Sequence, residues 1–179
     1  PGTDTFVLPT RRSPGLARAE NLLLLNTEGK LLAGDGQPNS EFWIHARIYA
    51  ARPDVGGVVH AHPPGCICLT QIGQPLKVVF NQAAAFRMGV PEYERIGLIR
   101  SRELGDLVAQ KLGQGNAVMM RGHGMAVALP DIRSAAVIAC YLEESASLQL
   151  RMLNAAGGDS RRLRVYSEED AERVGGDNN

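Results

Sequence analysis

The chain has 179 residues, a length that suits one domain with a core large enough to fold without disulfide bonds. Lysine plus arginine and aspartate plus glutamate both number 19, and no polybasic segment occurs, so the sequence gives no support for binding to nucleic acid or to an anionic membrane. The apolar stretches are also far too short to span a bilayer.

Apolar runs between turn-forming residues predict a series of short strands. In chain order we expect strands at 5–8, 21–25, 31–33, 55–61, 77–80, 117–120, 125–128 and, at an edge, 161–165. Helical spacing and end signals predict helices at 41–51, 102–112 and 132–155 and a last helical turn or two from 167. Short turns join several strands. They favour an α/β fold of the α+β type, with three layers and a central, mostly antiparallel or mixed sheet flanked by helices.

The cysteines and the first residues bear on the compartment and the extent of the chain. An odd count of three cysteines, without framework spacing, indicates reduced thiols in a cytoplasmic protein. Cys66-Ile67-Cys68 is interpreted as packing rather than as a thiolate metal site, and Cys140 as part of a helix core. Because the chain begins without Met, we expect an incomplete N-terminus on a single domain that covers residues 1–179.

Two short phrases carry three of the four histidines. His60 and His62 lie in a strand-like run, and side chains two apart on a strand point to the same side. His123 follows the run 117–120 at a turn between two glycines. A single His-x-His is a weak signal, but imidazole is a poor filler for an apolar strand because its nitrogens need partners. Three imidazoles indicate a metal site with an open position for substrate, which is typical of an enzyme.

A carboxylate stands at the start of the first predicted helix. Glu41 would be favoured there by the helix dipole whatever its role. The functional interpretation is that the helix N-terminus and the histidine strand converge, so that Glu41 transfers protons beside the metal. Asn39 or Ser40 would cap the helix and, with free N–H groups, offer donors to an anionic substrate. His45, one turn later, is interpreted as a partly buried helix residue rather than as a substrate contact.

Together these residues resemble the class II aldolase/adducin family. The resemblance covers roughly residues 5–155 and rests on a carboxylate, 19 residues to the first histidine, two to the second and 61 to the third. It implies a class II aldolase-like fold and a metal-dependent lyase that forms a homotetramer with active sites at subunit boundaries. The ion would be zinc or manganese, with iron or cobalt as alternatives. The metal ligands that the resemblance implies are Glu41, which is also the catalytic acid/base, His60, His62 and His123.

The branch of the family is read from the anion-binding residues. This chain lacks the Gly-Asn-x-Ser segment with which the sugar-phosphate aldolases hold phosphate, and it has arginine where they have glycine after Thr10. Arginine pairs well with carboxylates, although these arginines could also be solvated loop residues. We therefore expect decarboxylation of a hydroxylated aromatic or heteroaromatic carboxylate through a metal-stabilised enolate. The alternatives are an aldolase or epimerase acting on a ketose phosphate and, more remotely, a non-enzymatic adducin-like assembly module. The expected substrate contacts are Thr10, Arg11, Asn39, Ser40 and Arg121, with Arg12 as a further candidate.

Overall fold

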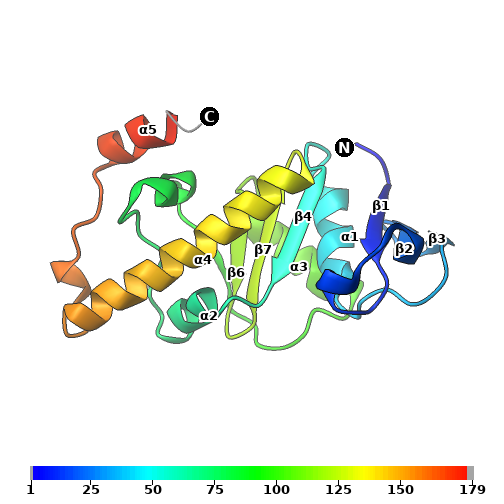
Figure 1. Ribbon diagram of the computed structural model, residues 1–179, viewed down its shortest axis with the longest axis horizontal. Helices are drawn as coiled ribbons and strands as arrows, with labels where there is room; N and C mark the ends of the chain where they lie inside the picture. Colours follow the sequence, from blue (N-terminus) through cyan, green and yellow to red (C-terminus); the bar gives the residue numbers. More distant parts are fainter. Residues whose placement is uncertain (1, 177–179) are drawn as a thin grey trace.

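The computed structural model describes residues 2–176 (Figure 1). Its strands are β1 (Thr5–Pro9), β2 (Leu22–Asn26), β3 (Leu31–Ala33), β4 (Gly57–Ala61), β5 (Glu92–Tyr93), β6 (Ala117–Met120) and β7 (Gly124–Leu129). Its α-helices are α1 (Phe42–Ala51), α2 (Pro64–Gln71), α3 (Arg102–Leu112), α4 (Ile132–Ala155) and α5 (Glu168–Gly176). Short 3-10 helices include η3 (Asn81–Phe86) and η4 (Ser160–Arg162). No helix in this part of the chain is both long and apolar enough to cross a membrane.

The strands form two sheets. One has the order β1-β2-β3 with antiparallel pairs, and the other has the order β4-β7-β6-β5. In the second sheet β4 pairs with β7 and β7 with β6 in antiparallel fashion, while β5 runs parallel to β6. The expected α/β class with a mostly antiparallel, mixed sheet architecture is confirmed.

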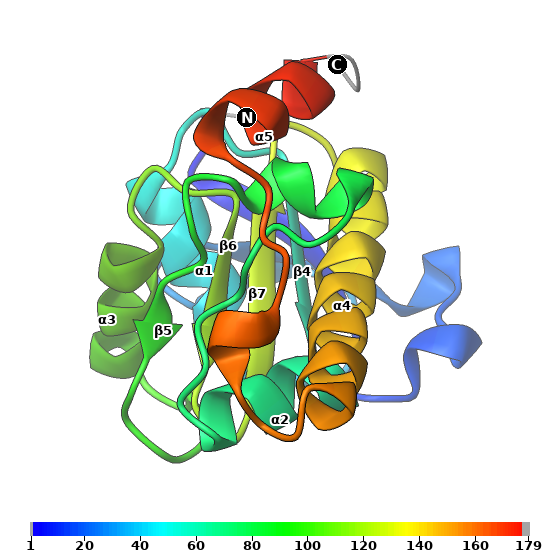
Figure 2. The same cartoon turned by 90° about the vertical axis from the view of Figure 1, so that its left-hand side faces the viewer.

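Helices cover both faces of the four-stranded sheet, which makes three layers (Figure 2). Alternate strand residues face opposite layers. Val118 and Met120 pack in the cluster with α1 and α3, whereas Ala117 and Met119 pack in the cluster with α4. By the same alternation, His60 lies on the side of Val58, which is the side of α1. The sheet therefore presents His60 toward the helix that Glu41 precedes.

Helix α1 connects the two sheets. Its residues Ile44 and Ile48 pack against the four-stranded sheet, and Ala46 packs with Phe6 and Leu25 of the three-stranded sheet. All three of these α1 side chains are fully buried. Burial on two sides fixes the helix firmly, since each buried aliphatic side chain stabilises the fold by roughly 1.5–3 kcal/mol. The start of α1 is thereby held at a defined place beside β4.

The structure corrects two predicted strands. Residues 77–80 form no strand, because the Lys77 N–H donates to the side-chain carbonyl of Gln149 and the Val78 carbonyl accepts from Tyr166 N–H. Residues 161–165 form no edge strand either, because the chain there first turns through η4, whose N-cap Asp159 accepts the Arg161 N–H. In both places side chains or a distant loop take up backbone groups that a strand would pair.

Two smaller expectations also need correction. Helix α1 begins at Phe42, and its N-cap residue is Glu41, not Ser40 or Asn39 as predicted. The Asn39 side chain instead accepts the Glu41 N–H, at 3.1 Å. Cys140 is exposed, not a core residue. It follows Ala139 on α4 and therefore lies about 100° around the helix from the buried face.

Candidate metal centre

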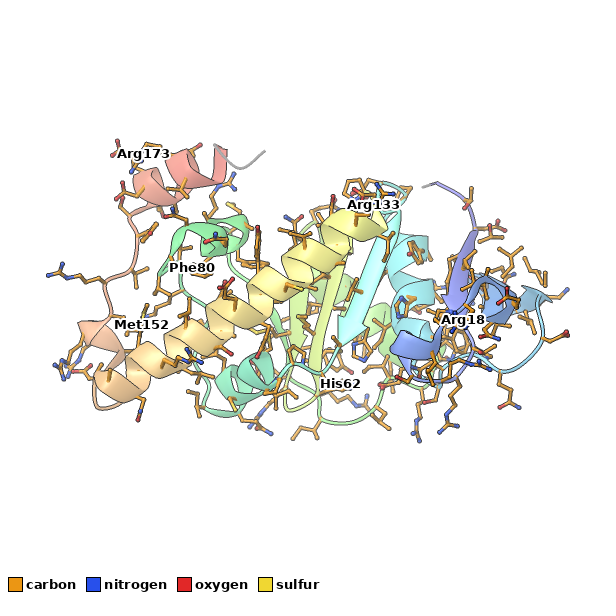
Figure 3. All side chains as sticks on the ribbon, in the orientation of Figure 1. Arg18, His62, Phe80, Arg133, Met152 and Arg173 are labelled. Atoms are coloured by element: carbon orange, nitrogen blue, oxygen red, sulfur yellow. The ribbon has the colours of Figure 1, made fainter. Side chains whose placement is uncertain are left out.

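Four side chains converge where β4 ends. His60 lies in β4 and His62 just beyond it (Figure 3), while His123 lies in the turn between β6 and β7. Because β4 runs antiparallel to β7, with Ala61 opposite Met125, the end of β4 lies beside that turn. Glu41 enters from the start of α1. One ligand atom from each of the four lies within 4.8 Å of the others.

The carboxylate of Glu41 lies among the three imidazoles. Its Oε1 is 3.2 Å from His123 Nε2, and its Oε2 is 3.8 Å from His60 Nε2 and 4.0 Å from His62 Nε2. The two Nε2 atoms of His60 and His62 are 3.1 Å apart. All of these atoms therefore face one small volume, which is the arrangement that a single ion requires.

Backbone groups hold two of the four side chains. The Nδ1–H of His60 donates to the Met125 carbonyl at 2.8 Å, which fixes the tautomer and leaves the Nε2 lone pair directed at the centre. The Ile99 N–H donates to Glu41 Oε1 at 2.8 Å. Neither partner could be found from the sequence, because every residue has a carbonyl and nearly every one an N–H. Only the fold brings these two to the site.

The two positions on either side of His123 require glycine for different reasons. Gly122 has φ +62°, a left-handed conformation that side chains other than glycine's rarely adopt. Gly124 lies against β4 so closely that a Cβ there would collide with the Ala61 carbonyl oxygen and the backbone of His62. The Gly-His-Gly phrase is thus required for the turn itself and for its close approach to the strand that carries the other two histidines.

Burial and neighbouring groups together shift the pKa values of these residues. Glu41 is 6% exposed, and burial alone would raise the pKa of its carboxyl. Its interactions with His60, with the Ile99 N–H and with the charge of His123 outweigh this and lower the pKa to about 2. Burial lowers the pKa values of His62 and His123. At neutral pH the centre therefore holds an ionised Glu41 carboxylate, and the lowered pKa values of His62 and His123 favour their neutral rings; these are the forms that bind metal.

The residues fit a divalent cation. Among the described residues, neither ring nitrogen of His123 has a hydrogen-bond partner of good geometry, although both atoms are buried. The facing Nε2 atoms of His60 and His62 need a proton or a cation between them, because two lone pairs repel. Three imidazoles and one carboxylate suit zinc, manganese, iron or cobalt alike. Cys66 and Cys68 do not belong to this group, and Cys66 is buried in the core instead.

A cleft of about 690 Å³ lies beside the centre. The two edge strands β1 and β4 line it together with α1, and His60 contributes to its wall. Three polar residues of the cleft come from the predicted anion-binding segments, namely Thr10, Arg12 and Asn39. The Thr10 hydroxyl is buried and has no hydrogen-bond partner among the described residues. The cleft thus combines an apolar wall with a few polar groups, one of them the unpartnered Thr10 hydroxyl, as expected of a binding site for a small organic anion.

The other expected substrate contacts lie apart from this cleft. The side chains of Arg11 and Arg121 are exposed, and Ser40 is half-buried without lining the cleft. Arg12, which lines it, donates to the Asn21 side-chain oxygen at 2.8 Å. The contacts made by these residues with a substrate remain predictions, and Arg12 is the arginine best placed among them.

His45 gives the protein a specific sensitivity to acid. It is partly buried, as predicted, and burial followed by the charge of His60 lowers its pKa from 6.5 to about 3. The unfolded chain binds a proton at His45 more readily than the folded protein does. The neutral His45 therefore contributes its full stability above pH 6.5, and this contribution is lost as the pH falls toward 3. Between pH 7.5 and 5, the metal-free protein should lose roughly 2 kcal/mol more unfolding free energy than H45Q. Urea unfolding at the two pH values measures this, and equal losses in both proteins would contradict it.

Comparison with known proteins identifies the family. Residues 1–150 match the family model of the class II aldolase and adducin N-terminal domain. The chain belongs to this family. It is 29% identical over 160 residues to the 3,4-dihydroxyphthalate decarboxylase of Arthrobacter keyseri, which covers 83% of this chain and 64% of that protein. It is 26% identical over 155 residues to the L-fuculose phosphate aldolase of Methanococcus maripaludis, which covers 86% of this chain and 82% of that protein.

A solved structure gives the same fold. An L-fuculose 1-phosphate aldolase superposes with a TM-score of 0.81 at 19% identity, over 97% of this chain and 80% of that one. The resemblance to the class II aldolase/adducin family that the glutamate and histidine spacing indicated is confirmed. The chain spans less than two thirds of the length of the Arthrobacter decarboxylase that it matches.

Proposed function

We propose that this chain is a divalent-metal-dependent carbon–carbon lyase. The observation that carries the proposal is the convergence of Glu41 with His60, His62 and His123, one of which, His60, also lines a cleft. We infer further that the reaction is decarboxylation of a hydroxylated aromatic or heteroaromatic carboxylate. This finer step is supported by the similarity to 3,4-dihydroxyphthalate decarboxylase and by an arginine, Arg12, in the cleft.

The four residues divide the work between binding and proton transfer. A cation held by the three imidazoles and the Glu41 carboxylate would supply Lewis-acid charge to the substrate's oxygens. Arg12 and the unpartnered Thr10 hydroxyl, which both line the cleft, would hold a substrate carboxylate there. When the bond from the ring carbon to its carboxylate breaks, CO2 leaves and the electron pair stays on the substrate.

The carbon then takes up a proton that originates from water, with Glu41 as the group that delivers it. With a pKa of about 2 the carboxylate is ionised at neutral pH, so it must first take the proton from water or orient a water that delivers it. The Ile99 N–H keeps the carboxylate in place during this step.

Aldol cleavage of a ketose phosphate is the second candidate. The similarity to the Methanococcus L-fuculose phosphate aldolase favours it, as does Thr10, which the sugar-phosphate aldolases share at this place by resemblance. The same glutamate and histidines would serve, with an aldehyde leaving where decarboxylation releases CO2. Epimerisation of a ketose phosphate would use the same glutamate and histidines. An adducin-like assembly role is the remote alternative, and the intact set of four ligand residues speaks against it.

The proposal extends to assembly and location. We infer a homotetramer with active sites at subunit boundaries, and the exposed side chains of Met88, Ile96 and Leu98 near β5 offer apolar surface for such contacts. A cytoplasmic location stays a prediction from the three cysteines, which are free in the structure. Light scattering of the purified protein tests the tetramer.

The deciding experiment uses one purified sample for two measurements. Elemental analysis gives the bound metal per chain, and the loaded protein is then assayed for CO2 release from hydroxylated aromatic carboxylates and for aldehyde release from ketose phosphates. About one metal ion per chain with CO2 release is expected. Aldehyde release would show that the protein is an aldolase. If the protein bound neither zinc nor manganese after reloading, the lyase proposal would be overturned.

A further inference from the structure

Helix α2 links two of the candidate ligands. It begins at Pro64, two residues after His62, and its other end packs on the turn that carries His123. Its first turn is fastened to α4, because the Glu143 carboxylate accepts the N–H groups of Gly65 and Cys66 at 2.9 and 3.1 Å. Its residues Cys66 and Leu69 are fully buried in the core on the α4 side of the sheet, so its far end can serve as a rigid support for the histidine turn.

The support consists of one buried hydroxyl and one side-chain contact. Thr70 is 2% exposed, its hydroxyl donates to the Ile67 carbonyl at 2.8 Å, and the same oxygen accepts the Gly122 N–H at 3.2 Å. Gln71 lies over Gly122, where a Cβ would come within 2.5 Å of its amide nitrogen. Both contacts reach the residue directly before His123.

The turn is also restrained on either side of this contact, because the Arg121 N–H donates to the Tyr93 carbonyl at 2.9 Å and Gly124 lies tightly against β4. The His123 N–H donates to the Met120 carbonyl at 3.0 Å, but its ring nitrogens have no well-oriented hydrogen-bond partner among the residues described. His60, by contrast, has its ring fixed through Nδ1 and the Met125 carbonyl. The direction of the His123 ring must therefore come from the backbone that carries it, and directly before the histidine that backbone is anchored through Gly122.

We propose that Thr70 is a positioning residue for His123: its hydroxyl, by holding the Gly122 N–H, sets the angle at which the imidazole enters the metal centre. This inference rests on the proposed metal-binding function. Outer partners of metal ligands influence affinity because a site must hold its ligands to within about half an ångström, and their loss weakens binding by roughly 10- to 100-fold. Thr70 touches no reacting atom and acts only through the turn.

The test compares Thr70→Val, which keeps the shape and removes the hydroxyl, with Thr70→Ser, which keeps the hydroxyl. Cobalt(II) is titrated into each metal-free protein, and both the affinity and the visible absorption of the bound ion are recorded. Thr70→Val should bind cobalt at least about tenfold more weakly, with a changed absorption spectrum, and Thr70→Ser should restore both. A purely structural role would lower the unfolding free energy without changing the spectrum of the bound ion.

Ser145→Ala is the matched control. Ser145 is fully buried, and its hydroxyl donates to a helix carbonyl, that of Tyr141, at 2.6 Å, as the Thr70 hydroxyl does to Ile67. The Ser145→Ala variant should bind cobalt with the affinity and the absorption spectrum of the wild type. Wild-type affinity and spectrum in Thr70→Val, or an equal loss in Ser145→Ala, would overturn the positioning role. Failure of the wild-type protein itself to bind cobalt would instead overturn the proposed metal centre.

Discussion

Replacing His60 with alanine should reduce bound divalent metal to background and lower lyase turnover by about a thousandfold or more. The imidazole has 6% exposure, is fixed through Nδ1 to the Met125 carbonyl and directs Nε2 at the centre, so no neighbouring side chain can replace it. A metal ion contributes several kcal/mol of charge stabilisation to a reaction of this kind, and each 1.36 kcal/mol is a factor of ten in rate. Metal analysis after gel filtration, with initial rates at saturating substrate, provides the measurement.

The control for this experiment is the remaining histidine. His45 lies outside the group of four, so H45Q should retain its metal while H60A loses it. Self-association should be unchanged in H60A, because His60 faces the interior and the cleft. Full turnover in H60A would remove His60 from the site, and loss of metal in both proteins would point to general unfolding.

Replacing Glu41 with glutamine should separate proton transfer from metal binding. The amide keeps the size of the carboxylate and can still accept the Ile99 N–H, and three imidazoles remain to hold the ion. Turnover should nevertheless fall between about a hundredfold and ten-thousandfold, the usual range for a lost acid/base group. Single-turnover rates on metal-loaded protein, with bound metal measured on the same sample, check this expectation.

The appropriate comparison is a glutamate far from the centre. Glu144 is exposed on α4, and its change to glutamine should leave both the rate and the metal content at wild-type values. If metal-loaded E41Q turned over like the wild type, Glu41 would have no part in proton transfer. If E41Q lost its metal completely, its main role would be that of a ligand.

The fold could be predicted where a segment's own pattern decides its structure. The long helix α4 follows from the buried spacing of Ala135, Ala139, Leu142 and Ala146, and β6 with β7 follows from two apolar runs around a glycine turn. The hydrophobic pattern fails to predict the structure of a segment where partners far along the chain determine it. The run at 77–80 has the composition of a strand, but the buried side chain of Gln149, over seventy residues away, binds its first N–H.

The candidate site shows the same division. The glutamate and the three histidines could be predicted from the sequence, because their residue types and spacing are unusual for an apolar strand and a glycine turn. The groups that orient them are backbone atoms, such as the Ile99 N–H, or an ordinary residue such as Thr70. Substrate contacts are harder still to predict. Arg11 and Arg12 are both exposed, but only Arg12 lines the cleft, and the local path of the loop decides which of them does.

The unequal exposure of the four ligand residues has a kinetic consequence. The side chains of Glu41, His60 and His123 are each less than a tenth exposed, whereas that of His62 is 56% exposed. An ion can therefore enter or leave on the His62 side by rotation of one accessible ring, which is fast, without any opening of the sheet or of α1. We expect capture of the ion from a cellular donor, or its removal by a chelator, to begin at this residue. The speed of metal exchange would then be independent of how stably the rest of the protein is folded.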